Sequence, residues 1–273
     1  MDTTIEPVAD GFEFPEGPAF YADGVLHLTQ LRSGWISRVS GGVSEDVVNT
    51  GGPNGAAFDE SNVLWIAEAK NGQLLRYDGE NLVEIAAEWE GRPLQKPNDL
   101  VFHPDGSIFL TGPGGSNAET PIGVVYHVTR DGDLRVVADC LAFPNGLALT
   151  ADALILYVVE TSRQQIVTYR VNEDLTLTGP ELFAETPGGV GGDGMALDVD
   201  GNLYLAHFGT GEIAVFDPAG KRIAGLPAGG EKPTNVAFGG DDMRDLFVTE
   251  VESGAVHRLR PGPEGMKPFC DPR

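Results

Sequence analysis

The sequence predicts an all-β fold, a six-bladed β-propeller with four-stranded blades. Three observations lead to this prediction. A short motif recurs roughly every 40 to 50 residues along the whole chain, and the stretches between its copies are short, strand-like runs rich in Val, Leu, Ile, Phe and Tyr. No stretch shows the 3.6-residue periodicity of a helix. Since no linker or low-complexity segment divides the repeats, we expect one propeller domain over residues 1–273.

Each copy of the motif places a polar residue at the start of a short apolar run, and we call these polar residues the ring residues. Proline precedes the ring residue in five copies, and Gly192 precedes it in the sixth. The six ring residues are Glu16, Asn54, Asn98, Asn145, Asp193 and Thr234. Equivalent positions of propeller blades surround one axis, so we expect these side chains to converge there.

The first three repeats each contain four short apolar runs separated by turns. Asp-Gly pairs at 23–24 and 105–106 mark hairpins, because both residue types tolerate a positive φ. The predicted strands are 17–21, 25–30, 34–40 and 45–50 in the first repeat, 55–59, 63–69, 73–78 and 82–88 in the second, and 99–104, 107–112, 123–129 and 134–139 in the third.

The last three repeats follow the same pattern, except that the sixth lacks a fourth strand. Their predicted strands are 146–150, 154–160, 166–172 and 181–185, then 194–199, 203–208, 212–217 and 221–226, then 235–240, 245–250 and 255–260. The segment 8–17 aligns without a gap on 137–146, which places Ile5–Val8 where an outer strand precedes a blade. We therefore predict that the N-terminus supplies the missing outer strand and closes the ring, which an open solenoid would not require.

The composition of the chain limits the classes of binding partner that we expect. Eighteen basic against 41 acidic residues give a net charge of −23, which argues against nucleic acid and anionic membranes as partners. No apolar run approaches the ~20 residues of a membrane helix, and the N-terminus has no signal-peptide pattern. The two cysteines, Cys140 and Cys270, show no paired spacing and fit a reducing compartment, with Cys140 expected to be buried. These features predict a cytoplasmic protein that acts on a small molecule.

The ring residues have the chemistry of a cation site. Glu16 and Asp193 are carboxylates, and Asn98 and Asn145 add amide oxygens. Oxygen-only ligand sets suit hard cations such as Ca²⁺, Mg²⁺ or Mn²⁺. Two carboxylates in a channel of low dielectric repel each other, and a cation removes that repulsion. We expect one divalent ion, and this ligand type favours Ca²⁺.

Four segments carry a resemblance to a known family. They are FPEGPAF, KPNDLVFHPDGSIFLT, FPNGLALT and GGDGMALDVDGNLYLA. In this order they resemble signature segments of the senescence marker protein 30 (SMP-30), gluconolactonase and luciferin-regenerating enzyme family, and the likeness covers nearly the whole chain. It implies a six-bladed propeller with a divalent metal in the central channel. It also implies metal binding by Glu16, Asn145 and Asp193, and metal or substrate contact by Asn98. Because family members use Ca²⁺, Zn²⁺, Mn²⁺ or Fe²⁺, the resemblance does not fix the ion.

The function that this resemblance implies is metal-dependent hydrolysis of a small cyclic ester, with a sugar-type lactone as the first choice. The cation would polarise the carbonyl, and Asp193 would act as general base, with a metal-bound hydroxide as the alternative nucleophile. Two other functions stay open: an organophosphate or aryl-ester hydrolase on the same site, and a non-catalytic binding propeller in which the metal is structural.

Weaker candidates surround the ring. Lys96 takes the place of a substrate-binding Arg of some family lactonases, and Asp99 is expected to contact substrate or to orient Asn98. His207 is a candidate substrate contact at the channel mouth. Glu160 and Glu250 end the second strands of repeats four and six, where a channel rim is possible.

One residue departs from the family pattern. Many members have Thr-Asp-Pro after the second strand of repeat three, where this chain has Thr111-Gly112-Pro113. A carboxylate is therefore missing from the mouth, which bears on the substrate more than on the metal. The G-x-G-x-x-G match at 189–194 is not followed by a helix and does not indicate a dinucleotide site.

Overall fold

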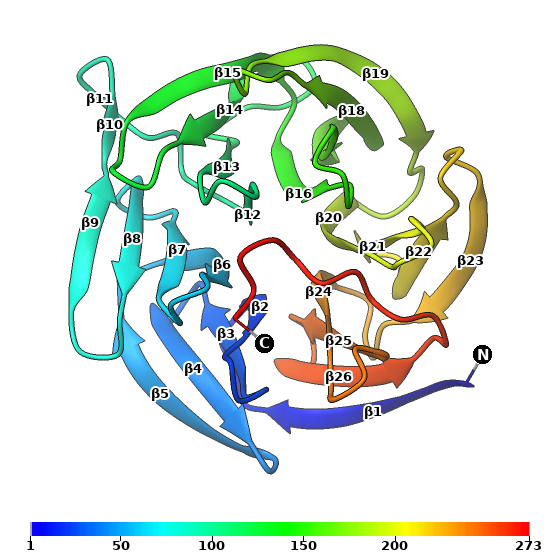
Figure 1. The fold of residues 1–273 in the computed structure, drawn as a ribbon. Coiled ribbons are helices and arrows are strands. Elements are labelled where there is room, and N and C mark those ends of the chain that lie inside the picture. The colour runs from blue at the N-terminus through cyan, green and yellow to red at the C-terminus, as the bar shows by residue number, and fades with distance from the viewer. Residues whose placement is uncertain (1, 273) are drawn as a thin grey trace.

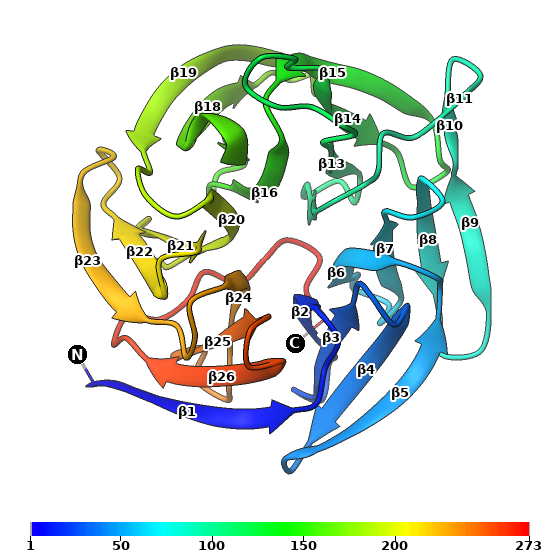
Figure 2. The same cartoon turned by 180° about the vertical axis from the view of Figure 1, so that it is seen from behind.

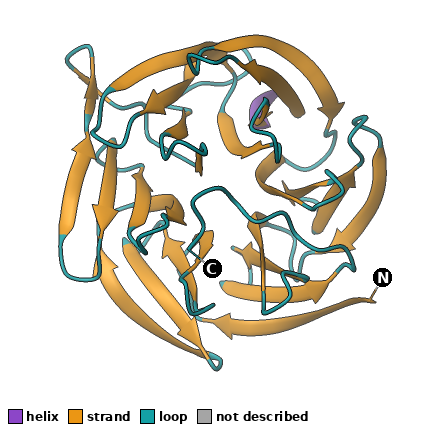
Figure 3. Cartoon of the chain, in the orientation of Figure 1, coloured by secondary structure: helices purple, strands orange, loops and turns teal. Residues whose placement is uncertain are grey.

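Six four-stranded antiparallel sheets surround a central axis in the computed structural model, which describes residues 2–272 (Figure 1). The fold is a six-bladed β-propeller, as predicted. Within the described residues the only helical element is one 3₁₀ turn, η1 (Thr161–Arg163), and the rest is strand and loop (Figure 3). No helix in residues 2–272 is long and apolar enough to cross a membrane.

The inner strand of each blade is its first in the chain, and the order runs outward. Blade one contains β2 (Pro15–Phe20), β3 (Leu26–Gln30), β4 (Trp35–Ser40) and β5 (Val43–Asn49). Blade two contains β6 (Pro53–Phe58), β7 (Leu64–Glu68), β8 (Gln73–Tyr77) and β9 (Leu82–Ala86). Blade three contains β12 (Leu100–Phe102), β13 (Ile108–Gly112), β14 (Gly123–Val128) and β15 (Leu134–Leu141). The small hairpin of β10 (Glu88–Trp89) and β11 (Arg92–Pro93) lies between blades two and three in the sequence.

The second half of the chain repeats this arrangement. Blade four contains β16 (Pro144–Leu149), β17 (Ile155–Glu160), β18 (Gln165–Val171) and β19 (Leu177–Glu185). Blade five contains β20 (Gly191–Leu197), β21 (Leu203–Phe208), β22 (Glu212–Phe216) and β23 (Arg222–Pro227). Blade six contains β24 (Pro233–Gly239), β25 (Asp245–Glu250) and β26 (Ala255–Arg260), with β1 (Asp2–Asp10) as its outer strand.

The N-terminus closes the ring, as predicted. Strand β1 pairs antiparallel with β26, from Asp2 opposite Arg260 to Asp10 opposite Ala255 (Figure 2). Ile5 and Val8 pack against buried clusters of blade six and its neighbours. The last blade is thus built from both ends of the chain, and β1 covers the edge that β26 would otherwise expose.

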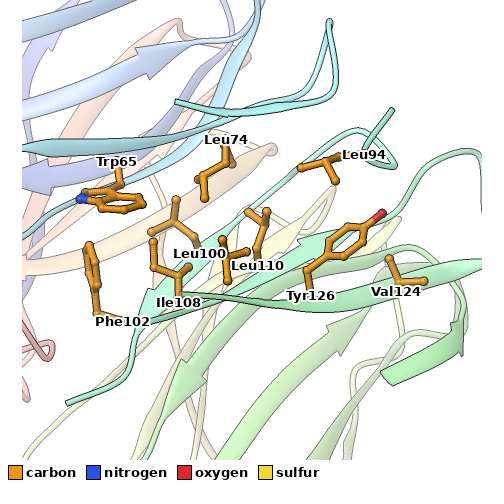
Figure 4. Packing of buried hydrophobic residues seen from close by; sticks show 11 residues of the cluster. Trp65, Leu74, Leu94, Leu100, Phe102, Ile108, Leu110, Val124 and Tyr126 are labelled. Atoms are coloured by element: carbon orange, nitrogen blue, oxygen red, sulfur yellow. The ribbon is translucent and has the colours of Figure 1, made fainter. Parts of the chain in front are cut away.

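The hydrophobic core lies between neighbouring blades. Strand residues alternate between the two faces of a sheet, and each face packs against the next blade. Figure 4 shows the cluster between blades two and three, in which Trp65 meets Phe102 with ring centroids 5.9 Å apart. The other labelled members are Leu74, Leu94, Leu100, Ile108, Leu110, Val124 and Tyr126. Edge-to-face contacts of this kind hold the inner strands in place around the axis.

Four hydrogen bonds from threonine hydroxyl groups connect a blade to the inner strand of the next blade. The bonds join a threonine Oγ1 to a main-chain carbonyl oxygen at or beside a ring residue. They run from Thr29 to Asn54 at 2.5 Å, from Thr111 to Asn145 at 2.8 Å, from Thr161 to Gly192 at 2.7 Å, and from Thr234 to Pro15 at 2.6 Å. These buried hydrogen bonds fix the position of the ring residue along the propeller axis in four of the six blades.

Candidate metal centre

All six ring residues lie at or beside the start of an inner strand and are buried, with exposures of at most 8%. Glu16 and Asp193 come from blades one and five, yet their carboxylates are close enough to interact electrostatically. The inner strands therefore bring these ring carboxylates together at the axis, as the repeat pattern predicts.

A second polar layer lies directly below the ring. The residue after the ring residue is glycine in four blades, at Gly17, Gly55, Gly146 and Gly194. In blades three and six it is Asp99 and Asn235. Asn235 Nδ2 donates to Asp99 Oδ2 at 3.4 Å, so the two side chains meet across the axis. A Cβ atom on Gly55 would collide with Asp99, and one on Gly194 with Asn235, so these glycines make room for the pair.

Hydrogen bonds orient the oxygens of this centre. Asn145 Nδ2 donates to Thr161 Oγ1 at 3.2 Å, and the Asn145 side chain also hydrogen-bonds the Asp193 carboxylate. Both contacts use the amide NH₂ group, which leaves the Asn145 carbonyl oxygen for a cation. The Asn235 side chain hydrogen-bonds the Glu16 carboxylate as well as Asp99.

The electrostatics of the centre favour the binding of a positive charge. Burial, followed by the neighbouring carboxylates, raises the pKa of Glu16 and of Asp193 well above their ordinary values. Burial raises the pKa of Asp99 to about 6. The groups that lower these three pKa values are all hydrogen-bond donors, and no cationic side chain of the described residues is among them. Two buried carboxylates and the partly buried Asp99, without a cationic partner among residues 2–272, are costly in a site of low dielectric.

The residues present fit a hard divalent cation. No group of three or more His, Cys, Asp and Glu side chains in residues 2–272 forms a metal site by itself, so amide oxygens have to complete the ligand set. Glu16, Asp193, Asn98 and Asn145 would supply two carboxylates and two amides, and all four residues are buried. Oxygen ligands of this kind are those that Ca²⁺ and Mg²⁺ prefer.

We expect divalent-cation affinity to rise between about pH 5 and 7, because the raised pKa values make protons compete with the cation. The stability of the metal-free protein depends on pH in the opposite sense and falls as the pH rises. The contribution of Asp99 to stability is present below its ordinary pKa near 3.8 and is lost as the pH rises through about 6. Thermal unfolding with and without Ca²⁺ across this range measures both effects. Equal Ca²⁺ stabilisation at pH 5 and pH 7 would contradict the prediction.

The structure places the other sequence candidates around this centre. Lys96 is exposed in the loop before blade three, with φ of 49°, two residues from the ring residue Asn98. His207 is only 1% exposed, and its Nε2 lies 3.0 Å from the Gly188 carbonyl oxygen. The His207 ring thus contacts the loop that precedes β20.

Glu160 and Glu250 bind main-chain amides rather than facing the axis as free carboxylates. Glu250 Oε1 accepts from the amide of Lys232 at 2.9 Å, and Glu160 Oε1 accepts from the amide of Ala142 at 2.8 Å. Both are buried and anchor the loops that lead into ring residues. Their local role is structural. Cys140, expected to be buried, is exposed.

Packing accounts for Gly112 in the place of the family carboxylate. A Cβ atom there would lie 2.7 Å from Tyr126 Cε2. The Tyr126 hydroxyl accepts a hydrogen bond from the Gln95 amide at 3.1 Å, which fixes the ring in that space. An aspartate at position 112 therefore requires this tyrosine to move.

Sequence reasoning missed Asn235. The signal was present in the repeats, because the position after the ring is glycine in four copies and polar in only two. In the sixth copy the ring residue itself is Thr234, and the polar residue that reaches the centre is the next one. In the structure Thr234 is fully buried and bonded to blade one, while Asn235 reaches the carboxylates.

Comparisons with known proteins agree with this arrangement. A family model described as SMP-30/Gluconolactonase/LRE-like region matches residues 14–252. The chain is 30% identical over 236 residues to a diisopropyl-fluorophosphatase of Loligo vulgaris, covering 80% of this chain and 75% of the relative. It is 26% identical over 243 residues to a pentonolactonase of Haloferax volcanii, covering 86% and 80%. The solved structure of a gluconolactonase from Xanthomonas campestris matches with a TM-score of 0.83 at 27% identity, covering 94% and 89% of the two chains.

Proposed function

The chain belongs to the SMP-30/gluconolactonase/LRE-like family, and from this membership we propose that it is a metal-dependent hydrolase of small cyclic esters, with a sugar-type lactone as substrate. The observation that carries the proposal is the group of buried carboxylates at the axis, whose pKa values no cationic side chain of residues 2–272 lowers. The relatives named pentonolactonase and gluconolactonase support the lactone.

In this proposal Glu16, Asn98, Asn145 and Asp193 hold one divalent cation, with Ca²⁺ as the first choice. Bound there, a cation would supply Lewis acidity for polarising the lactone carbonyl and for stabilising the developing oxyanion. The buried amide of Asn235 holds Glu16 and Asp99 in fixed orientations, so little rearrangement is needed when the cation binds.

Asp193 is the proposed general base. Its carboxylate takes a proton from the water that attacks the carbonyl carbon, and the ring C–O bond then breaks. The departing oxygen takes up a proton, so that the product is an open-chain hydroxy acid. Asn145, which hydrogen-bonds Asp193, fixes the carboxylate that faces the water. In this proposal Asn98, Asp99 and the exposed Lys96, two residues before Asn98, bind hydroxyl groups of the substrate. His207 is proposed to support the substrate site through the loop that its Nε2 contacts at the Gly188 carbonyl.

A second candidate function keeps the site and changes the bond. The relative that is 30% identical is named diisopropyl-fluorophosphatase, and Gly112 removes a carboxylate from the channel mouth. Both observations favour an uncharged phosphotriester or aryl ester over a polyhydroxylated sugar. The two functions differ in the substrate and share the metal and the base.

Chelation and metal add-back test the proposal. We expect removal of the metal to lower hydrolysis of five- and six-membered sugar lactones by at least about 10²-fold, since a Lewis acid contributes several kcal/mol to the barrier. Calcium, or another single divalent ion, should restore it. Elemental analysis of each sample serves as the control.

Three outcomes separate the candidate functions. Undiminished lactone hydrolysis in protein shown to be free of metal would overturn metal dependence. Hydrolysis of a dialkyl phosphofluoridate without hydrolysis of any lactone would favour the second function. If the protein binds the metal but hydrolyses neither class of substrate, the non-catalytic binding propeller becomes the favoured function.

A further inference from the structure

A cavity of about 140 Å³ lies in the channel on the far side of the Asp99–Asn235 layer, and we call it the lower cavity. Asp99 and Asn235 line it, whereas Glu16, Asn145 and Asp193 do not. The lower cavity is therefore distinct from the candidate metal centre, and the two share only this polar layer.

Small side chains create the lower cavity. Three residues after the ring residue, the six inner strands carry alanine in five blades and Val101 in the other. Of these, Ala57, Ala148, Ala196, Ala237 and Val101 line the cavity. One residue further along, Phe58, Phe102 and Phe238 provide apolar wall at the end away from the ring. The cavity thus has a polar end, formed by Asp99 and Asn235, and an apolar body, and Asp271 lies among its lining residues after β26.

The segment after β26, residues 261–272, crosses the other end and forms part of its rim, and we call it the C-terminal segment. It runs across the centre of the disc on the face turned to the viewer in Figure 1. Main-chain bonds attach it to blades five and six: the amide of Met266 donates to the Leu197 carbonyl at 2.9 Å, and that of Gly265 to the Met243 carbonyl at 2.7 Å. Met266 and Phe269 line the cavity, and Phe269 also packs against the clusters on both sides of blade three.

We propose that the lower cavity binds a small molecule with an apolar body of about benzene size and one hydrogen-bond donor, of which phenol is the simplest example. An apolar cavity of about 150 Å³ is large enough to bind benzene or xenon. The Asp99 carboxylate accepts the Leu100 amide at 2.8 Å and the Asn235 amide, which leaves lone pairs for a further donor. A donor on the ligand would satisfy them, while the alanine and phenylalanine walls contact the ring.

This binding does not depend on the proposed hydrolase function. The ligand enters from the side of the C-terminal segment, where Met266, Pro268 and Phe269 form the rim, and not through the ring residues. We therefore expect phenol to bind to metal-free as well as to metal-loaded protein. A protein without any hydrolase activity should still bind it.

Calorimetric titration with phenol and with benzene tests the proposal. We expect phenol to bind at least about tenfold more tightly than benzene, the worth of one hydrogen bond to a charged acceptor. Ala196→Phe fills the cavity and should abolish binding, and Ala57→Leu, on a different blade, should weaken it at least tenfold. Ala219→Phe adds the same ring on an exposed turn and is the matched control.

Three results of these titrations would contradict the proposal. Absence of phenol binding to the unaltered protein at millimolar concentration overturns it. Unchanged affinity in both filled variants places any binding elsewhere and also overturns it. Equal affinities for benzene and phenol remove the donor from the proposal, because Asp99 then makes no bond to the ligand.

Discussion

Asp193→Asn is expected to lower turnover of a lactone substrate by about 10²–10⁴-fold even at saturating metal, the range that a positioned general base contributes. The amide has nearly the shape of the carboxylate and can still offer an oxygen to the cation, but it cannot take a proton from water. Asp193 is 8% exposed, and the Asn145 side chain hydrogen-bonds its carboxylate. The substitution therefore removes the base and changes little of the packing around it.

This experiment measures metal affinity and turnover independently, and the loss of turnover in Asp193→Asn should persist when the metal site is filled. Calorimetry gives the metal affinity of the variant, and the assay is then run at a concentration that fills the site. Glu16→Gln provides the comparison, because Glu16 is proposed to hold the cation without acting as base. Its turnover should recover much further at high metal concentration. Asp241→Asn, on an exposed turn, removes one surface charge and should leave turnover unchanged.

Two results would contradict the assigned role. Full turnover of metal-saturated Asp193→Asn would transfer the base function to a metal-bound hydroxide. Weaker metal binding in a protein that hydrolyses nothing before or after the substitution would fit the non-catalytic propeller.

The repeats made most of the fold predictable. A propeller blade is a local unit, so each copy of the motif carries its own strands and its own ring residue, and alignment of 8–17 on 137–146 even located the closing strand. Convergence of Glu16 and Asp193 followed from symmetry alone, because equivalent positions must face one axis.

Features that depend on contacts between different strands were not predictable in this way. Asn235 is part of the centre because Asp99 reaches it from across the axis, and no single repeat contains that contact. Gly112 is explained by Tyr126, which comes from the adjacent strand. Cys140 was expected to be buried among apolar neighbours. It lies instead where the β14–β15 register shifts, with φ of 60°, and this irregularity turns it outward.

Removal of residues 2–10 is expected to lower the free energy of unfolding by about 3 kcal/mol, since partial burial of Ile5, Val8 and Ala9 is worth about 1 kcal/mol each. For a chain of this size that corresponds to a fall in Tm of roughly 5–10 °C. The truncation also takes away the ladder with β26 and the ion pair of Glu6 with Arg258 at 2.9 Å, and it exposes β26 as an edge.

Thermal unfolding of the truncated protein beside the full chain measures this effect, with Thr4→Asn, an exposed site on the same strand, as the control. A peptide of residues 2–10 added in trans should raise the Tm of the truncated protein, because the vacant edge of β26 accepts a strand by main-chain bonding. That rescue distinguishes loss of closure from general misfolding. Equal Tm values for the truncated and full chains would mean that the seam between blades one and six holds without its shared strand.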